Sequence, residues 1–277
     1  MTILKILRFL VAIFCVQAPV ASLAATIFTD IYVFGDSLSD TDARVTNGDM
    51  WVEYLAPQLG LSYDPTNNYA VSGADSADIL NQVSTYEAGN TVDPDALYVV
   101  WGGAMDIFNN PLDPYSAITP ATTNLADAVG LLAGAGASHI LVPNLPDLGL
   151  TPEAISLGVE AEARAVSEAF NTSLATALAG YDTLDLDVFT LLNLVVADPP
   201  AYGLTNVTGS CVADGQDPAC TGYLFYDGVH PTTRGHELLA DAMYTAVVPL
   251  PASAFLLWSG LGVLALTARR RTEAAAA

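Results

Sequence analysis

Three residues with the chemistry of a serine hydrolase lie far apart in the chain. Ser37 lies in the block Gly35–Asp40 (GDSLSD), and Asp227 and His230 are three positions apart in the block Asp227–Thr232 (DGVHPT). A serine hydroxyl is a weak nucleophile unless a base lies within hydrogen-bonding reach, and a histidine held by an aspartate is such a base. The sequence therefore predicts a catalytic triad of Ser37, Asp227 and His230.

Each half of this pattern also has a purely structural explanation. A serine after a strand commonly forms a turn or caps a helix, and an aspartate before a glycine commonly forms a turn. The combination favours chemistry, because the other two histidines, His139 and His236, lie in an expected strand and an expected helix and are interpreted as structural. Three further acidic residues are interpreted as local hydrogen-bond partners: Asp36, Asp40 and Asp106.

The segments that must position these residues alternate between strand-like and helix-like patterns. β-rich apolar runs occur at residues 27–33, 68–71, 96–101, 138–142 and 184–192, the last including the start of a loop. Helical patterns occur at residues 50–59, 121–135 and 153–179, and a last helix is expected to have Pro231 as its first residue. This alternation predicts an α/β fold, a three-layer α/β/α sandwich with a doubly wound, mainly parallel five-stranded sheet. Ligands bind such sheets at the carboxyl ends of the strands, where Ser37 follows the first strand.

Four blocks occur in the order Gly35–Asp40, Asn68–Ala74, Gly103–Asp106 and Asp227–Thr232. In this order they resemble the GDSL-type members of the SGNH hydrolase superfamily, especially the secreted phospholipase- and lecithinase-like branch. The resemblance implies a flavodoxin-like fold and hydrolysis of carboxylic esters through an acyl-enzyme on Ser37. It also implies that the substrate is a small-molecule, lipid or polysaccharide ester.

One position departs from the pattern of that family. The resemblance implies an oxyanion hole made of the backbone N–H groups of Ser37 and Gly73 and of an asparagine side chain, but Met105 occupies the asparagine position. A thioether donates no hydrogen bond, and loss of one such donor typically lowers the rate by about 10² to 10³. Three nearby asparagines are candidates to replace it: Asn68, Asn109 and Asn110.

This departure leaves two classes of function open. The first is a serine esterase or lipase-type hydrolase that is weakened or altered in its activity. The second is a non-catalytic SGNH-fold protein that binds at the cell surface or in the extracellular matrix. The triad residues favour the first class, because a protein that no longer catalyses has no need to retain all three of them.

The amino-terminal segment has the features of a secretory signal peptide. Residues 1–25 contain two basic residues, a short apolar run and small residues at a cleavage site. An uncleaved anchor is the alternative, although the apolar run is short for a membrane span. The sequence thus predicts export, followed by a hydrolase domain at residues 26–246.

The carboxyl-terminal segment predicts a membrane association. Residues 247–271 form an apolar run long enough to span a bilayer that ends in three arginines, and residues 272–277 form a short tail. The sequence VPLPA at its start resembles a PEP-CTERM sorting tail, which implies processing by an exosortase-type enzyme at the inner membrane and release to the cell surface. A plain transmembrane anchor is the alternative.

Two cysteines remain outside the predicted signal peptide, Cys211 and Cys220, and they enclose eight residues. In an exported protein such an isolated pair favours a disulfide over a metal site, which needs further ligands. No metal-binding cluster and no phosphate-binding glycine loop is present in the sequence, so no cofactor is implied.

The acidic composition excludes one class of partner. The chain has a formal net charge of −22, and residues 26–246 hold only three arginines, no lysine and 29 acidic residues, a net charge of −26. Such a surface repels nucleic acids and other polyanions. It is typical of proteins from saline habitats and equally of acidic secreted proteins.

Overall fold

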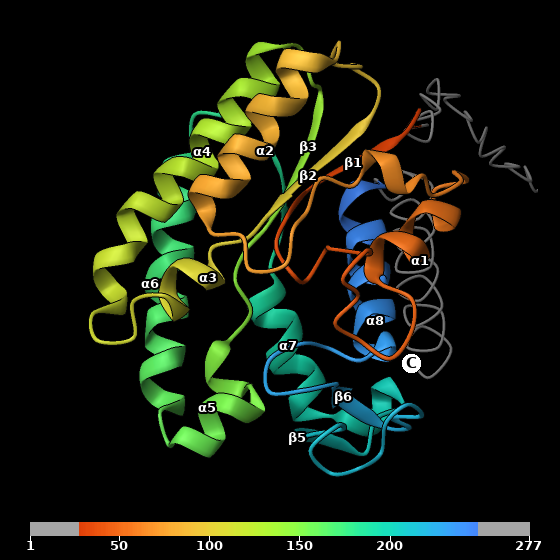
Figure 1. The fold of residues 1–277 in the computed structure, drawn as a ribbon, viewed down its shortest axis with the longest axis vertical. Coiled ribbons are helices and arrows are strands. Elements are labelled where there is room, and N and C mark those ends of the chain that lie inside the picture. The colour runs from red at the N-terminus through yellow and green to blue at the C-terminus, as the bar shows by residue number, and fades with distance from the viewer. Residues whose placement is uncertain (1–27, 249–277) are drawn as a thin grey trace, which may run out of the picture. The chain divides into compact units, whose positions relative to one another are not determined.

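Parallel strands form the centre of the protein in the computed structural model, which describes residues 28–248 (Figure 1). The strands pair in chain order: β1 (Ile31–Gly35), β2 (Leu97–Trp101), β3 (His139–Pro143) and β4 (Leu184–Leu186). Every residue of β2 is buried, as expected for a strand that is covered on both faces. The predicted α/β class with a parallel sheet is confirmed.

The expected strand around Asn68 is reduced to a single bridge beside β1. Asn68 pairs with Val33 in parallel orientation, and the backbone N–H groups of Tyr69 and Val71 donate to the carbonyls of Val33 (2.8 Å) and Gly35 (3.1 Å). Only these two bonds form before the chain turns away, so the regular sheet has four strands and not five. With this segment counted, the spatial order is 2-1-3-4-5, the flavodoxin-like order whose switch point lies beside the first strand.

Helices cover both faces of the sheet. One face carries α2 (Ser76–Gly89), α4 (Ile118–Gly134) and α6 (Glu160–Leu178), and the other carries α1 (Trp51–Gln58) and α8 (Thr233–Val247) (Figure 1). Side chains alternate along β1, so Phe34 packs in the core under α2 and Val33 packs in the core under α1. This arrangement is the predicted three-layer sandwich.

Two predicted segments have different boundaries in the structure. The helix expected over residues 153–179 is two helices, α5 (Pro152–Leu157) and α6, because Gly158 ends α5 in the left-handed conformation with φ +69°. The segment expected as a strand and loop at 184–192 is β4 followed by α7 (Val188–Ala197). This helix starts where the carboxylate of Asp187 accepts a hydrogen bond from the Thr190 N–H.

The last helix begins later than expected. Thr232 is its cap, and the Thr232 hydroxyl accepts a hydrogen bond from the Gly235 N–H. Pro231 lies before the cap and pairs with Phe225 in an isolated antiparallel bridge. The expectation that Pro231 is the first residue of α8 was therefore wrong, because the turn before the helix takes up this residue. The sequence analysis also did not predict α2, although Asp75 caps it.

Shorter elements complete the described chain. They are α3 (Ala104–Phe108), four 3₁₀ turns at Pro65–Asn67, Pro114–Ala117, Leu148–Leu150 and Pro199–Tyr202, and a small separate sheet of β5 (Asn206–Ser210) and β6 (Tyr223–Phe225). The predicted disulfide is present: Cys211 and Cys220 are bonded across the loop between β5 and β6, with their Cα atoms 5.4 Å apart.

The predicted targeting segments lie outside the described residues. These are the signal peptide at residues 1–25 and the apolar segment at 247–271, apart from Val247 and Val248. Within residues 28–248, none of the helices combines the length and the apolar character that a membrane crossing needs.

Candidate active site

The structure brings the three predicted triad residues together. His230 Nε2 lies 2.8 Å from Ser37 Oγ, and His230 Nδ1 lies 2.8 Å from Asp227 Oδ2. Ser37 follows β1 at the carboxyl edge of the sheet, and the other two residues lie between β6 and α8. A histidine that contacts a serine through one ring nitrogen and an aspartate through the other can remove the serine proton.

The electrostatics of Asp227 fit a role as the residue that orients the histidine. Partial burial opposes ionisation of this carboxyl group, but hydrogen bonds from the His230 side chain and from the His230 and Val229 N–H groups outweigh it. The pKa of Asp227 therefore lies below its ordinary value. The ionised carboxylate holds the proton of the imidazole on Nδ1, which leaves Nε2 free to accept the serine proton.

Backbone hydrogen bonds hold the turn that presents Asp227 and His230. The Tyr226 N–H donates to the carbonyl of His230 (2.8 Å), and the Thr232 N–H donates to the carbonyl of Leu224 (2.9 Å). From the other end of the sequence, the Thr46 hydroxyl donates to the carbonyl of Pro231 (2.9 Å). These contacts close the turn on both sides of the histidine.

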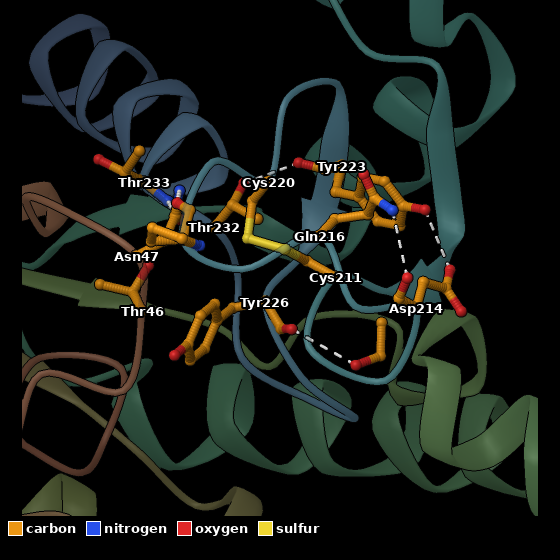
Figure 2. Close-up of a disulfide and its surroundings, with 12 residues drawn as sticks. Thr46, Asn47, Cys211, Asp214, Gln216, Cys220, Tyr223, Tyr226, Thr232 and Thr233 are labelled. Carbon is orange, nitrogen blue, oxygen red and sulfur yellow. Dashed lines mark hydrogen bonds between the residues drawn. A yellow bond between two sulfur atoms is a disulfide. The ribbon is translucent and has the colours of Figure 1, made fainter.

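The disulfide loop supports the same turn. The backbone N–H groups of Cys211 and Val212 donate to the carbonyls of Phe225 (3.1 Å) and Tyr226 (2.9 Å). Figure 2 shows the bridge to Cys220 beside Tyr226 and near Thr232, the cap of α8. The covalent link thus holds the residues directly before Asp227.

A buried acidic residue shapes the turn that carries Ser37. The Asp36 side chain accepts a hydrogen bond from the Leu38 N–H (3.0 Å), and its backbone carbonyl accepts from the Ser39 N–H (3.0 Å). The side chain is only 2 % exposed, and this burial raises the pKa of Asp36 to about 6. The predicted role of Asp36 as a local hydrogen-bond partner agrees with these contacts.

Two backbone donors at the site are available to an oxyanion. Ser37 and Gly73 line the same pocket, and within residues 28–248 the N–H of neither residue makes a hydrogen bond. Gly73 has φ +84°, a conformation that favours glycine, and a Cβ atom there would meet nothing within 4 Å. Both predicted backbone donors therefore lie at the pocket with their N–H groups unpaired.

Met105 lies in the wall of this pocket, in the first turn of α3. The preceding Gly103 has φ +108°, and a Cβ atom on it would lie 2.2 Å from the ring of Phe170, so glycine is required there. Asp106 accepts hydrogen bonds from the N–H and hydroxyl of Ser76 at the start of α2 (2.9 and 2.7 Å). Hydrogen bonds from Ser76 thus hold α3 in place, and the residue of α3 at the position expected for the third donor is Met105, whose thioether cannot donate a hydrogen bond.

None of the three candidate asparagines replaces the missing donor. The Asn68 amide donates to the carbonyl of Ser39 (2.7 Å), and its oxygen accepts from the Ala70 N–H (3.1 Å). Asn110 is exposed and donates to the carbonyl of Asp106 (2.8 Å), and Asn109 is exposed at the end of α3. No asparagine lines the pocket in the described part of the chain.

The pocket beside Ser37 is large and mostly apolar, with a volume of about 810 Å³. The loop between β3 and α5 contributes Pro146, Leu148 and Thr151, and α7 contributes Leu191 and Val195. The parts of the wall from α5 and α7 could not be predicted from the sequence, because apolar residues that line a pocket have the same pattern as residues that fill a core.

The sequence matches a model of the family described as GDSL-like lipase/acylhydrolase over residues 31–243. It is 30% identical to an uncharacterized protein of Pseudomonas putida, 32% to Lipase 1 of Photorhabdus luminescens and 31% to esterase EstA of Pseudomonas aeruginosa. These matches cover 87%, 68% and 79% of this chain and 52%, 32% and 46% of the relatives. The chain therefore spans about half the length of these relatives or less.

Solved structures with the same fold include two groups of hydrolases. A member of the lipolytic G-D-S-L family from Veillonella parvula has a TM-score of 0.52 at 20% identity, over 77% of this chain and 94% of that one. The acetylxylan esterase Axe2 of Geobacillus stearothermophilus has a TM-score of 0.55 at 16% identity, over 80% and 96%. At these identities the likeness supports the fold alone.

Proposed function

Because the chain belongs to the GDSL-like lipase/acylhydrolase family, we propose that it is a serine hydrolase that cleaves carboxylic esters through an acyl-enzyme on Ser37. The observation that carries this proposal is the continuous hydrogen-bonded series from Ser37 through His230 to Asp227. It has the geometry of an activated nucleophile, which a purely structural serine does not need.

The first half of the reaction forms the acyl-enzyme. Ser37 Oγ attacks the ester carbonyl carbon while its proton passes to His230 Nε2, and Asp227 stabilises the imidazolium that results. The carbonyl oxygen becomes an oxyanion that accepts hydrogen bonds from the N–H groups of Ser37 and Gly73. When the tetrahedral intermediate collapses, the C–O bond of the ester breaks and His230 returns the proton to the departing alcohol.

The second half releases the acid. His230 removes a proton from a water molecule, and the hydroxide that forms attacks the acyl carbon. The bond to Ser37 Oγ then breaks, and His230 returns the proton to the serine. Since only two donors stabilise the oxyanion in each half, the rate should be lower than with a third donor by about 10² to 10³.

The pocket supports a neutral ester with an apolar acyl chain as the substrate. The volume of the pocket, about 810 Å³, is larger than an acetyl group requires, and the walls of the pocket are mostly apolar. The net charge of −26 over residues 26–246 disfavours substrates with several negative charges. Similarity to a protein named Lipase 1 is consistent with this substrate class.

The sequence also supports a proposal about location. We infer that residues 1–25 direct export and that residues 247–271 are processed by an exosortase-type enzyme at the inner membrane, which leaves the protein at the cell surface. Mass spectrometry of the surface form tests this. Removal of the residues after about position 251 is expected, and retention of the three arginines would indicate a plain anchor.

Hydrolysis of p-nitrophenyl butyrate and octanoate by the purified protein tests the proposed reaction. The Ser37→Ala variant should lose the activity, and Ser84→Ala, a change at an exposed serine of α2, should retain it. Equal rates for wild type and Ser37→Ala would reject the esterase proposal. Met105 favours the second candidate, a non-catalytic surface-binding protein, which equal rates would support.

A further inference from the structure

Exposed apolar side chains stand where the pocket meets the solvent. Phe108 at the end of α3, and Leu157 and Val159 around the end of α5, all line the pocket, yet they are 40%, 66% and 38% exposed. Leu112 is 100% exposed and lies between Pro111 and Pro114, which both line the pocket. We call Phe108, Leu112, Leu157 and Val159 the apolar rim.

The two segments that form the apolar rim lack charge in an otherwise acidic chain. Residues 107–112 and 155–159 contain no acidic or basic side chain, although Asp113 and Glu160 follow them directly and Glu153 lines the pocket. Figure 1 places α3 and α5, whose last residues begin these segments, in the half of the molecule toward which β1, β2 and β3 run. An apolar cluster at the mouth of a pocket indicates contact with a partner that has an apolar interior.

The charges of the chain restrict the kind of surface that fits the apolar rim. Each arginine in residues 28–248 is already paired: Arg44 with Glu53, Arg164 with Asp147, and Arg234 with Glu237. Residues 28–248 thus offer no unpaired arginine for anionic headgroups and contain no lysine, while their net negative charge repels such headgroups. A surface with no net charge needs no cationic side chain to bind it, and the negative charge of the protein does not repel it.

We propose that the apolar rim docks on neutral or zwitterionic lipid surfaces and inserts Leu112 and Leu157 among the acyl chains. This inference rests on the proposed function and adds a source of the substrate to it. An acyl chain of a docked lipid can pass across Phe108 into the pocket beside Ser37. A protein partner or a second copy on the rim would cover the pocket instead. Docking itself requires no catalysis.

Flotation with lipid vesicles tests the docking in the full chain carrying Ser37→Ala, so that no lipid is hydrolysed. The rim-dependent binding is the binding of this parent minus that of its Leu112→Asp variant, which removes the contribution of the terminal segments. We expect this rim-dependent binding to be larger on phosphatidylcholine vesicles than on phosphatidylglycerol vesicles. Leu112→Asp should weaken the binding by about tenfold or more, since a leucine side chain leaves the lipid. Tyr181→Asp is the matched control: Tyr181 is 38% exposed but follows the far end of α6 from the rim. The terminal segments are the same in every variant and cannot produce a difference between them.

A fluorescent side chain reports on the rim directly. With phosphatidylcholine vesicles, Leu112→Trp should show a blue-shifted emission that brominated lipid quenches, after subtraction of the parent spectrum, and Tyr181→Trp should not. Equal flotation of Leu112→Asp and its parent, an unshifted Leu112→Trp, or equal rim-dependent binding to the two kinds of vesicle would overturn the docking proposal.

These outcomes are distinct from a failure of the proposed function. Leu112 does not line the pocket, so Leu112→Asp should hydrolyse soluble p-nitrophenyl butyrate at the parent rate in the Ser37 background. Vesicle binding without any ester hydrolysis would reject only the esterase. Hydrolysis of the soluble ester without rim-dependent binding would reject only the docking. Equal melting temperatures of Leu112→Asp and its parent show that both are folded.

Discussion

The carboxylate of Asp40 accepts a hydrogen bond from the backbone N–H of Ser72 at 2.7 Å. The other oxygen of Asp40 accepts from the N–H groups of Asp42 and Ala43 (both 3.0 Å), which fixes the chain just after the nucleophile. Burial opposes ionisation of Asp40, but these hydrogen bonds outweigh it and lower its pKa. Asp40 thereby joins the turn of Ser37 to the turn of Gly73, the two residues whose backbone N–H groups we propose as oxyanion donors.

Removal of this link should misplace the Gly73 donor. Asp40→Ala is expected to lower kcat by up to about 10²-fold with a smaller effect on KM, because the displaced N–H matters most in the transition state. Steady-state kinetics with p-nitrophenyl butyrate measures this. Asp40→Asn retains an acceptor oxygen and should restore part of kcat. An unchanged kcat in Asp40→Ala would contradict the positioning role.

The aspartate of the triad should control the protonation of His230. Asp227→Asn is expected to reduce kcat by about 10⁴-fold, because an amide can stabilise the wrong tautomer of the imidazole. The variant should remain folded, as judged by circular dichroism. Asp214→Asn, a change at an exposed acid of the disulfide loop, is the control. Similar losses in both variants would argue against a specific role of Asp227.

Met105, at the proposed third position of the oxyanion hole, should limit the rate. Met105→Asn adds a donor to a pocket wall that already faces Ser37 and Gly73, and kcat should rise by about 10² to 10³. Met105→Leu keeps an apolar side chain of similar size and should give no increase. If Met105→Asn also gives none, the hole has its third donor from another group or the cleft has another purpose.

Loss of the disulfide should destabilise the turn that carries the triad acid and base. The double variant Cys211→Ser/Cys220→Ser frees a loop whose backbone bonds to Phe225 and Tyr226. The free energy of unfolding should fall by about 2 to 3 kcal/mol, the value typical of a short loop. Urea denaturation followed by tryptophan fluorescence measures it. A change below about 0.5 kcal/mol would mean that the backbone bonds suffice, as surface changes commonly have effects of that size.

The buried acid beside the nucleophile makes a pH-dependent contribution to stability. The pKa of Asp36 is about 6 in the folded protein, compared with its ordinary value of 3.8 in the unfolded chain. Between these values the folded state binds more protons, so this contribution to stability falls as pH rises, and it stays low above pH 6. Above pH 6 the Asp36 side chain carries a buried charge, and Asp36→Asn removes the destabilisation that this charge causes. At pH 4 the acid is protonated and neutral, so the substitution removes no charge.

The stability of Asp36→Asn relative to wild type should therefore increase by up to about 3 kcal/mol between pH 4 and pH 8. Urea denaturation of both proteins at the two pH values measures the difference. The wild type alone is not informative, because the buried His236, with its pKa lowered by burial to about 3, changes stability in the opposite direction over the same range. A difference independent of pH would contradict the raised pKa of Asp36.

The sequence by itself determined the fold class, the three triad residues as candidates and the disulfide. Each depends on a local pattern: alternating apolar periodicities, the short blocks around Ser37 and His230, and two cysteines nine positions apart. Such patterns can be recognised in a sequence because they depend only on the chemistry of each residue type and on its immediate neighbours in the chain.

Tertiary structure alone decided which groups complete the site. Asn68 was a candidate donor from its position in the chain, but its amide is bound to the carbonyl of Ser39. Leu157 and Leu191 had the pattern of core residues, yet they line the pocket. The direction of a polar side chain and the burial of an apolar one depend on contacts between segments distant in sequence, which no local pattern contains.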